Sequence, residues 1–232
     1  MTVSFPRLAA AALAMLITTG CTHQFQWPRD PTRSARSNDY TKFRAEDPHS
    51  ILVVPAVNRS VDVTAPDYFL SSISIPLAER GYYVFPVNLV KQVMADDGLS
   101  DSDMVHEQEP QRLADLFGAD SVMYISIERW DARYVVLSTA VTVSLNYVLK
   151  SGRSGETLWS SRQTVQYAPN NNDSGGGLAG LIAQAIVAAI QKAAPDYMPL
   201  AQQANNQALY AAGSGLPAGP YHGLYGQDKD TY

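Results

Sequence analysis

The sequence predicts an α+β domain in which helices pack on one mixed sheet. Between residues 51 and 127, short apolar or β-branched runs alternate with amphipathic stretches in the order β-α-β-α-β. Between residues 134 and 167, strand-like segments follow one another, and two of them are joined by a glycine-containing turn. A final amphipathic stretch predicts a helix that closes the domain.

The domain opens with the run Ile51–Val54, which is continuously apolar, as in a buried central strand. The next segment, Asp67–Arg80, has one apolar helical face. Pro66 suits its first turn and Gly81 its end. Pro76 lies inside this pattern, so we expect it to kink the helix or divide it in two.

The second strand is predicted over Tyr82–Val87, which is aromatic and β-branched, and a short helix over Leu89–Met94. The acidic residues 95–109 are expected to form a solvated loop that caps a helix. A further helix begins at Pro110 and ends at Gly118. The third strand covers Ser121–Ile127 and can extend through Trp130.

Three strands in series are predicted next, over Tyr134–Leu137, Val141–Lys150 and Thr157–Tyr167. The last two alternate in hydrophobicity, as half-buried strands do. Residues 151–155 (SGRSG) between them are typical of a hairpin turn.

The closing helix is predicted over Leu178–Ile190, where large apolar residues fall on one stripe. We expect this stripe to pack on the sheet. Gly180 and Ala183 lie on the opposite, small-residue side, where a partner protein or a second copy could approach closely. Gly175, Gly177 and Gly180 have the spacing G-x-G-x-x-G, but no strand leads directly into them and none follows the helix. A dinucleotide site is therefore not predicted, and we expect no cofactor.

The N-terminus predicts a signal peptide over residues 1–20. Arg7 is followed by the apolar run Leu8–Ile17, which is too short to span a bilayer, and then by small residues. Cys21 is the single cysteine of the chain, and the segment before it resembles the lipobox of bacterial lipoproteins, although Thr18 replaces the preferred leucine. We expect cleavage between Gly20 and Cys21 and lipidation (palmitate) of Cys21. The alternative is an ordinary signal peptide that leaves a free thiol.

The predicted domain organisation has four parts. Residues 1–20 are the signal peptide, and residues 21–48 are a lipidated N-terminus and flexible tether that is polar and broken by prolines. Residues 49–212 form a single α+β domain. Residues 213–232 are a tail rich in Gly, Pro and Tyr, expected to be extended or disordered.

Composition and motifs argue against several functions. Loss of the signal peptide leaves 16 Lys and Arg against 22 Asp and Glu, without a basic patch, so nucleic acid is not an expected partner. Asp101 and Asp103 have a calcium-loop spacing, but the rest of the pattern is missing, and the four histidines are scattered. We find no nucleophile–base set. We therefore expect no catalytic residue, no metal site and no small-molecule substrate.

The most distinctive polar and aromatic stretch is SVDVTAPDYF, between the first strand and the first helix. It holds Asp62, Asp67 and Tyr68, which are more than a connection requires. The stretch predicts either a helix-capping loop or a recognition loop that contacts a partner.

Several strings in the chain resemble a known family. ILVVPAVNRSVDVTAPDYF, PLAERGYYVFPVNLV, LFGADSVMYISIERWDA and SGRSGETLW are similar to neisserial surface-antigen lipoproteins, a family labelled as a domain of unknown function. The resemblance extends from Ile51 to about Tyr225. It implies a fold like the TolB N-terminal domain, CsgG and LpoB, and it implies a CsgG-like lipoprotein as an assembly partner.

These observations lead to one main hypothesis and two rivals. The first is a non-enzymatic lipoprotein, anchored in the outer membrane by its lipid, whose periplasm-facing domain docks other envelope proteins, with a CsgG-like lipoprotein as the expected partner. Thr22 after Cys21 favours the outer membrane, while surface exposure and a homo-oligomer stay open. The alternative is a regulator of a cell-wall synthesis enzyme in the manner of LpoB, and the third is an enzyme with an unrecognised site.

Overall fold

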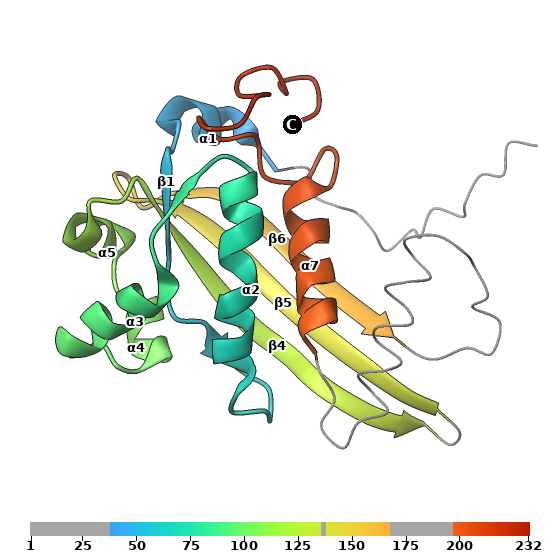
Figure 1. Ribbon diagram of the computed structural model, residues 1–232. Coiled ribbons are helices and arrows are strands. Elements are labelled where there is room, and N and C mark those ends of the chain that lie inside the picture. Colours follow the sequence, from blue (N-terminus) through green and yellow to red (C-terminus); the bar gives the residue numbers. More distant parts are fainter. Residues whose placement is uncertain (1–37, 136–137, 168–196) are drawn as a thin grey trace, which may run out of the picture. The chain divides into compact units, whose positions relative to one another are not determined.

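The computed structural model describes residues 38–135, 138–167 and 197–232. One mixed sheet of six strands organises them, with the strand order β3-β1-β4-β5-β6 and with β2 paired to β4 (Figure 1). The strands are β1 (Ser50–Val53), β2 (Val57–Asn58), β3 (Tyr83–Val84), β4 (Ser121–Val135), β5 (Ser138–Ser151) and β6 (Thr157–Tyr167). The pairs β1–β3, β1–β4 and β2–β4 are parallel, and β4–β5 and β5–β6 are antiparallel. The predicted α+β class with one mixed sheet is confirmed.

Helices lie on both faces of this sheet. They are α1 (Tyr40–Glu46), α2 (Ala65–Glu79), α3 (Val87–Asp96), α4 (Ser102–His106), α5 (Pro110–Phe117) and α7 (Met198–Tyr210). Helices α2 and α7 run side by side across β4, β5 and β6 (Figure 1). Helices α3, α4 and α5 belong to a separate apolar cluster, which uses the alternate residues of β1 and β4.

The larger core lies between the sheet and the α2–α7 pair. Side chains alternate across a strand, so every second residue of β4 and β5 faces these helices, including Met123, Ile125, Leu145 and Tyr147. These side chains are fully buried, and each stabilises the fold by about 1.5–3 kcal/mol on the scale for large apolar groups. Ile73 and Leu77 of α2 are buried in the same core, so this burial holds α2 on the sheet.

A β-bulge explains why β4 continues through a polar stretch. The register of β4 against β5 shifts between Ile127 and Arg129. The unpaired residue 128 shifts the alternation by one position. Trp130, instead of Arg129, therefore faces the core after Ile127, and Arg129 and Asp131 form an ion pair on the other face. The predicted separate strand Tyr134–Leu137 is therefore wrong, because residues 134 and 135 are the end of β4.

Local sequence patterns correctly predict most of the other helices and strands. The predicted helix over Asp67–Arg80 corresponds to α2, which is a single helix despite Pro76. Helix α5 ends at Phe117 and is followed by Gly118, whose φ of 69° is left-handed, as predicted for the helix end. The acidic loop contains the unpredicted α4, capped by the Asp101 carboxylate, which accepts from the backbone of Asp103. The predicted helix Leu178–Ile190 lies outside the described residues.

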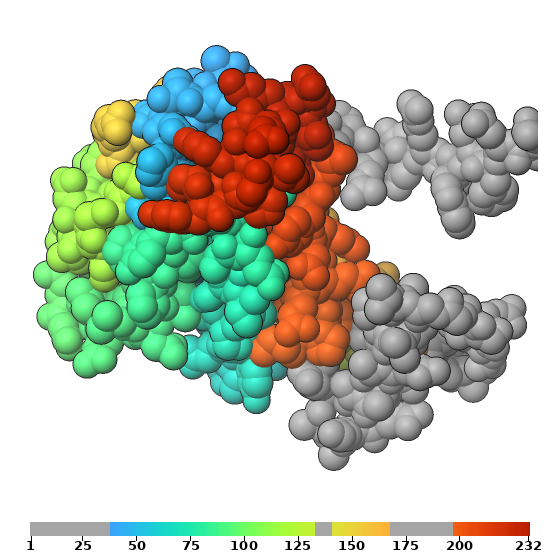
Figure 2. Space-filling view, turned by 45° about the horizontal axis from the view of Figure 1, so that its top comes forward, coloured from blue at the N-terminus to red at the C-terminus, as the bar shows by residue number. Residues whose placement is uncertain are grey.

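Two expectations about the ends of the domain are wrong. Helix α1 lies within residues 21–48, for which the sequence predicts a flexible tether, and its Tyr40 and Phe43 are buried in the main core. Residues 213–232 are not extended or disordered, because they fold against α1 and the end of α2 (Figure 2). The Tyr40 hydroxyl donates to the Gly215 carbonyl at 2.6 Å, and burial raises the pKa of Tyr40 to about 12.

A buried ion pair fixes this C-terminal segment. The Arg80 guanidinium lies 3.6 Å from the Asp228 carboxylate, and its Nε donates to the Leu216 carbonyl at 2.6 Å. The same carboxylate accepts from the backbone N–H of Ala218 at 2.6 Å. Gly81 is required here, because its φ is +90° and a Cβ would lie 2.5 Å from His222.

Candidate functional site

The loop between β2 and α2 is held in one shape by its own polar side chains. The Asp62 carboxylate accepts from the backbone N–H of Thr64 at 2.9 Å and from its hydroxyl at 2.7 Å. The Asn58 side chain donates to the Asp62 carbonyl at 2.7 Å and accepts from the backbone N–H of Ser60 at 3.0 Å. Asp62 therefore organises the loop, and its carboxylate is already occupied within the chain.

The apolar neighbours of Asp62 point outward. Val61 is 91% exposed and Val63 is 87% exposed. Two more exposed apolar side chains follow on α2, Tyr68 at 54% and Ile75 at 64%. Seven residues are about two helical turns, so Tyr68 and Ile75 lie on the same helix face. We call Val61, Val63, Tyr68 and Ile75 the α2 surface.

Asp67, the other predicted contact residue in this stretch, has a partner within the domain. Its carboxylate lies 2.6 Å from the Lys91 ammonium of α3. Both side chains are more than half exposed, so the pair contributes at most about 1 kcal/mol. Of the three predicted contact residues in this stretch, Tyr68 is thus the one whose exposed ring is available to contact a partner.

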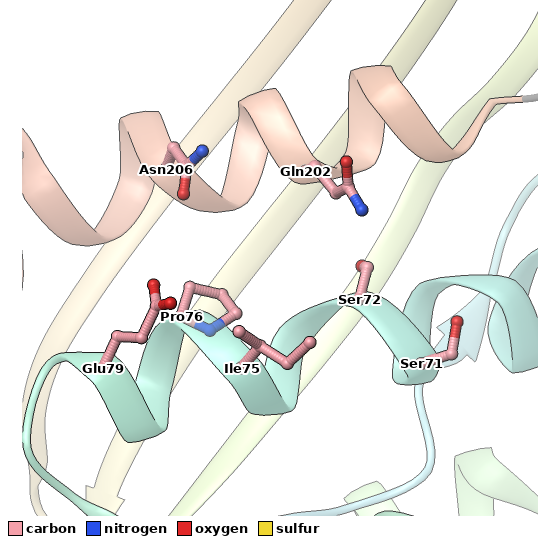
Figure 3. A pocket seen from close by; sticks show the side chains of 7 residues that line it. All are labelled: Ser71, Ser72, Ile75, Pro76, Glu79, Gln202 and Asn206. Carbon is pink, nitrogen blue, oxygen red and sulfur yellow. The ribbon is translucent and has the colours of Figure 1, made fainter.

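A shallow groove of about 200 Å³ runs between α2 and α7 beside this surface (Figure 3). Ser71, Ser72, Ile75, Pro76 and Glu79 line it from α2, and Gln202 and Asn206 line it from α7. Figure 3 shows the Gln202 side chain directed across the groove toward α2. Pro76 has no N–H, so the Ser72 carbonyl lacks the usual helical donor four residues on. Hydrogen-bond donors and acceptors thus both line the groove, and the apolar side chain of Ile75 lies at its edge.

A buried chain of hydrogen bonds fixes the floor of this groove. The Tyr147 hydroxyl of β5 donates to the Asn205 carbonyl oxygen at 2.7 Å. The Asn205 amide donates to the Ser72 hydroxyl at 3.0 Å. Asn205 is fully buried, and burial raises the pKa of Tyr147 well above its usual value. The network thus joins the sheet to both helices beneath the groove.

The described ranges contain no group of three His, Cys, Asp or Glu side chains placed to hold a metal ion. His106 packs edge-on against Tyr124, and its Nε2 lies 3.1 Å from the Pro55 carbonyl. Burial lowers the pKa of His106, so its neutral form is favoured. This arrangement suits a core contact rather than a proton-transfer site.

The other sequence-predicted sites lie elsewhere. Gly20, Cys21, Gly180 and Ala183 are outside the described residues, so their predicted roles in cleavage, lipidation and partner contact stay predictions. In the part of the chain that the structure describes, no helix is long and apolar enough to cross a membrane.

Comparisons with known proteins agree with this fold. The family "Putative lipoprotein GNA1162-like" matches residues 38–221. "Putative lipoprotein NMB1124/NMB1162" of Neisseria meningitidis serogroup B is 37% identical over 158 residues, which are 68% of this chain and 73% of that protein. The crystal structure of lipoprotein GNA1162 from Neisseria meningitidis matches with a TM-score of 0.52 and 36% identity, over 62% of this chain and 98% of that chain.

A more distant structure is the C-terminal domain of LpoB from Escherichia coli. It is 20% identical with a TM-score of 0.36, and the match covers 51% of this chain and 84% of that chain. A similarity at this level supports no functional inference. The matches to the family and to its neisserial members are the informative ones, and on them the chain belongs to the GNA1162-like lipoprotein family.

Proposed function

We propose that this chain is a non-enzymatic lipoprotein of the outer membrane, whose periplasm-facing domain docks another envelope protein through the α2 surface. Its lipid is attached to Cys21, after cleavage behind Gly20, and the partner is a CsgG-like lipoprotein. Membership of a lipoprotein family supports the lipid anchor.

The exposure of Val61 and Val63 is the observation that carries the docking proposal. Two β-branched apolar side chains that stand almost fully in water gain about 1.5 kcal/mol or more each when a partner covers them. The hydrogen bonds of Asp62 and Asn58 already fix the loop, so little conformational entropy is lost on binding. Tyr68 extends the same surface, and tyrosine is enriched at protein interfaces.

The groove beside the α2 surface supplies specificity. An apolar patch alone gives little discrimination between partners, whereas fixed donors and acceptors must be matched by the partner. Gln202 and Asn206 offer amide groups on one wall, and Glu79 offers a carboxylate on the other. A partner segment that crosses Ile75 would reach these groups directly.

The lipid anchor is tested by substitution of the single cysteine. Cys21→Ser should abolish palmitate labelling of the chain and release it from membranes in soluble form. If the unsubstituted chain stays on membranes but carries no palmitate label, lipid anchoring through Cys21 is contradicted.

The docking proposal is tested by a photo-reactive residue at position 63 of the full lipidated chain, in cells. The control carries the same residue at position 116, because Leu116 is 45% exposed on α5, which belongs to the other cluster. Crosslinks to a CsgG-like lipoprotein at position 63 and not at 116 support the proposal. A peptidoglycan synthase at position 63 would favour the LpoB-type regulator instead, and no excess at position 63 over the control would refute docking here.

A further inference from the structure

Among the residues that the structure describes, strand β6 forms one edge of the sheet. It pairs with β5 on one side, through Ser161↔Tyr147, Gln163↔Leu145 and Val165↔Val143. On the other side, the Asn38 side chain donates to the Ser160 carbonyl at 3.1 Å and accepts from the Ser160 N–H at 3.2 Å. The Asn38 amide therefore imitates a neighbouring strand at this position. It also shows that the backbone groups of Ser160 point outward.

The same outward direction recurs at every second residue of β6, at Arg162, Thr164 and Gln166. All three residues are exposed. None of the hydrogen bonds within the described ranges uses their outward N–H and C=O groups. Over five residues, which is about 17 Å of strand, the edge offers donors and acceptors to another strand.

We propose that this edge pairs with β6 of a second copy of the chain, antiparallel and centred on Thr164. Arg162 then faces the partner's Gln166, and Thr164 faces the partner's Thr164. The three facing pairs exchange two backbone hydrogen bonds each. The inference is independent of the α2 surface, which lies on α2 and the loop before it.

The side chains of β6 fit a second copy in this register. The Arg162 guanidinium donates to the amide oxygen of the partner's Gln166, and opposed threonines are a favourable cross-strand pair. A register centred on Arg162 would instead place two guanidinium groups face to face, which is unfavourable. Because the arrangement is two-fold symmetric, each copy offers the same row of groups.

Pairing along a short edge is weak for free molecules. A shared membrane surface raises the effective concentration of lipid-anchored copies, so the dimer is expected there first. The pairing is therefore tested on the full chain in its membranes, by oxidation of engineered single cysteines. Once Cys21 is acylated the chain has no other thiol, because it contains one cysteine.

Thr164→Cys should give a disulfide-linked dimer, because facing residues of such a pair lie about 5.5 Å apart between Cα atoms, which a disulfide can bridge. Arg162→Cys should give about tenfold less disulfide-linked dimer than Thr164→Cys, because the Cα atoms of the two copies of residue 162 are about 14 Å apart in this register. The double variant Arg162→Cys and Gln166→Cys should restore the crosslink, since these positions face each other.

A proline substitution at the centre of the β6 edge gives a second test of the pairing. Thr164→Pro removes an N–H that no hydrogen bond within the described residues uses, which an edge strand tolerates. It also removes the Thr164 hydroxyl, which lies 2.8 Å from the Ser144 hydroxyl, at a cost of about 1 kcal/mol. Added to the double cysteine variant, it should abolish the crosslink and leave the unfolding temperature within a few degrees. Equal dimer from Thr164→Cys and Arg162→Cys, no dimer from either, or a crosslink to a different polypeptide would each overturn the proposal.

Discussion

The buried pair of Arg80 and Asp228 predicts that the C-terminal segment is part of the folding unit. The substitution Asp228→Asn removes the charge but keeps the size of the side chain and an oxygen that can accept from Ala218. What remains is a guanidinium that is 8% exposed and has lost its carboxylate. Its Nη2 already makes no hydrogen bond within the described residues, so the ion pair is its main compensation.

The expected loss follows from this geometry. Breaking a buried ion pair by removal of one partner costs about 3–5 kcal/mol. The 3.6 Å separation and the faces of Tyr210 and Tyr232 near Arg80 favour the lower end, about 3 kcal/mol. For a domain of this size that is a fall of roughly 6–12 °C in the unfolding temperature.

Urea unfolding of the Cys21→Ser chain measures this free energy. Asp230→Asn is the matched control, because Asp230 is exposed and should change stability by at most about 0.5 kcal/mol. A double variant, Arg80→Met with Asp228→Asn, should lose less than the sum of its single variants, because no uncompensated charge is left. Additive losses, or an Asp228→Asn loss no larger than that of Asp230→Asn, would refute the reasoning.

Two further predictions concern the core. Asn205→Leu should destabilise the domain by about 2 kcal/mol, because the buried Tyr147 hydroxyl loses its acceptor. The control Asn206→Leu, on the exposed groove wall, should cost at most about 0.5 kcal/mol. Thermal unfolding of both variants measures the difference. Burial lowers the pKa of His106 below 6.5, so the folded state binds fewer protons than the unfolded state once the pH falls below about 6.5. Stability should therefore decrease as the pH falls below that value, and His106→Gln, which can keep a donor near Pro55, should weaken this pH dependence; an unchanged pH profile would contradict the assignment.

Elements with strong local signals were predictable from the sequence. Helix α5 has a proline at its start and a glycine at its end, and the hairpin before β6 has Gly155 with a φ of +75°. The run Ile51–Val54 is buried throughout, as a continuous apolar run predicts. In each case neighbouring residues determine the conformation.

The missed elements depend on contacts between distant residues. Helix α7 is rich in Gln and Asn and looks polar, but Leu200, Ala204 and Ala208 form a buried stripe that helical spacing could have revealed. The C-terminal segment has no periodicity at all. Its order comes from single contacts, such as the Tyr82 hydroxyl on the Pro217 carbonyl at 2.6 Å, and no local pattern encodes these.

The stretch SVDVTAPDYF stands out in the sequence, but only Tyr68 of its three predicted contact residues belongs to the α2 surface. The sequence predicts Asp62, Asp67 and Tyr68 as contact residues, because they are more than a connection requires and because function concentrates on loops held by a rigid scaffold. The structure shows the carboxylates of Asp62 and Asp67 engaged within the domain, and it exposes Val61 and Val63 instead. Two valines that flank an aspartate in an otherwise polar loop are the signal that could have identified them.

The most direct test of the account is the affinity of the domain for the envelope protein captured through position 63. Val63→Asp should weaken binding about tenfold to a hundredfold, because it removes about 1.5–3 kcal/mol of apolar burial, without lowering the unfolding temperature of an exposed position. Leu116→Asp, the control on α5, should bind like the unsubstituted chain. Equal affinities for all three proteins would contradict docking through the α2 surface.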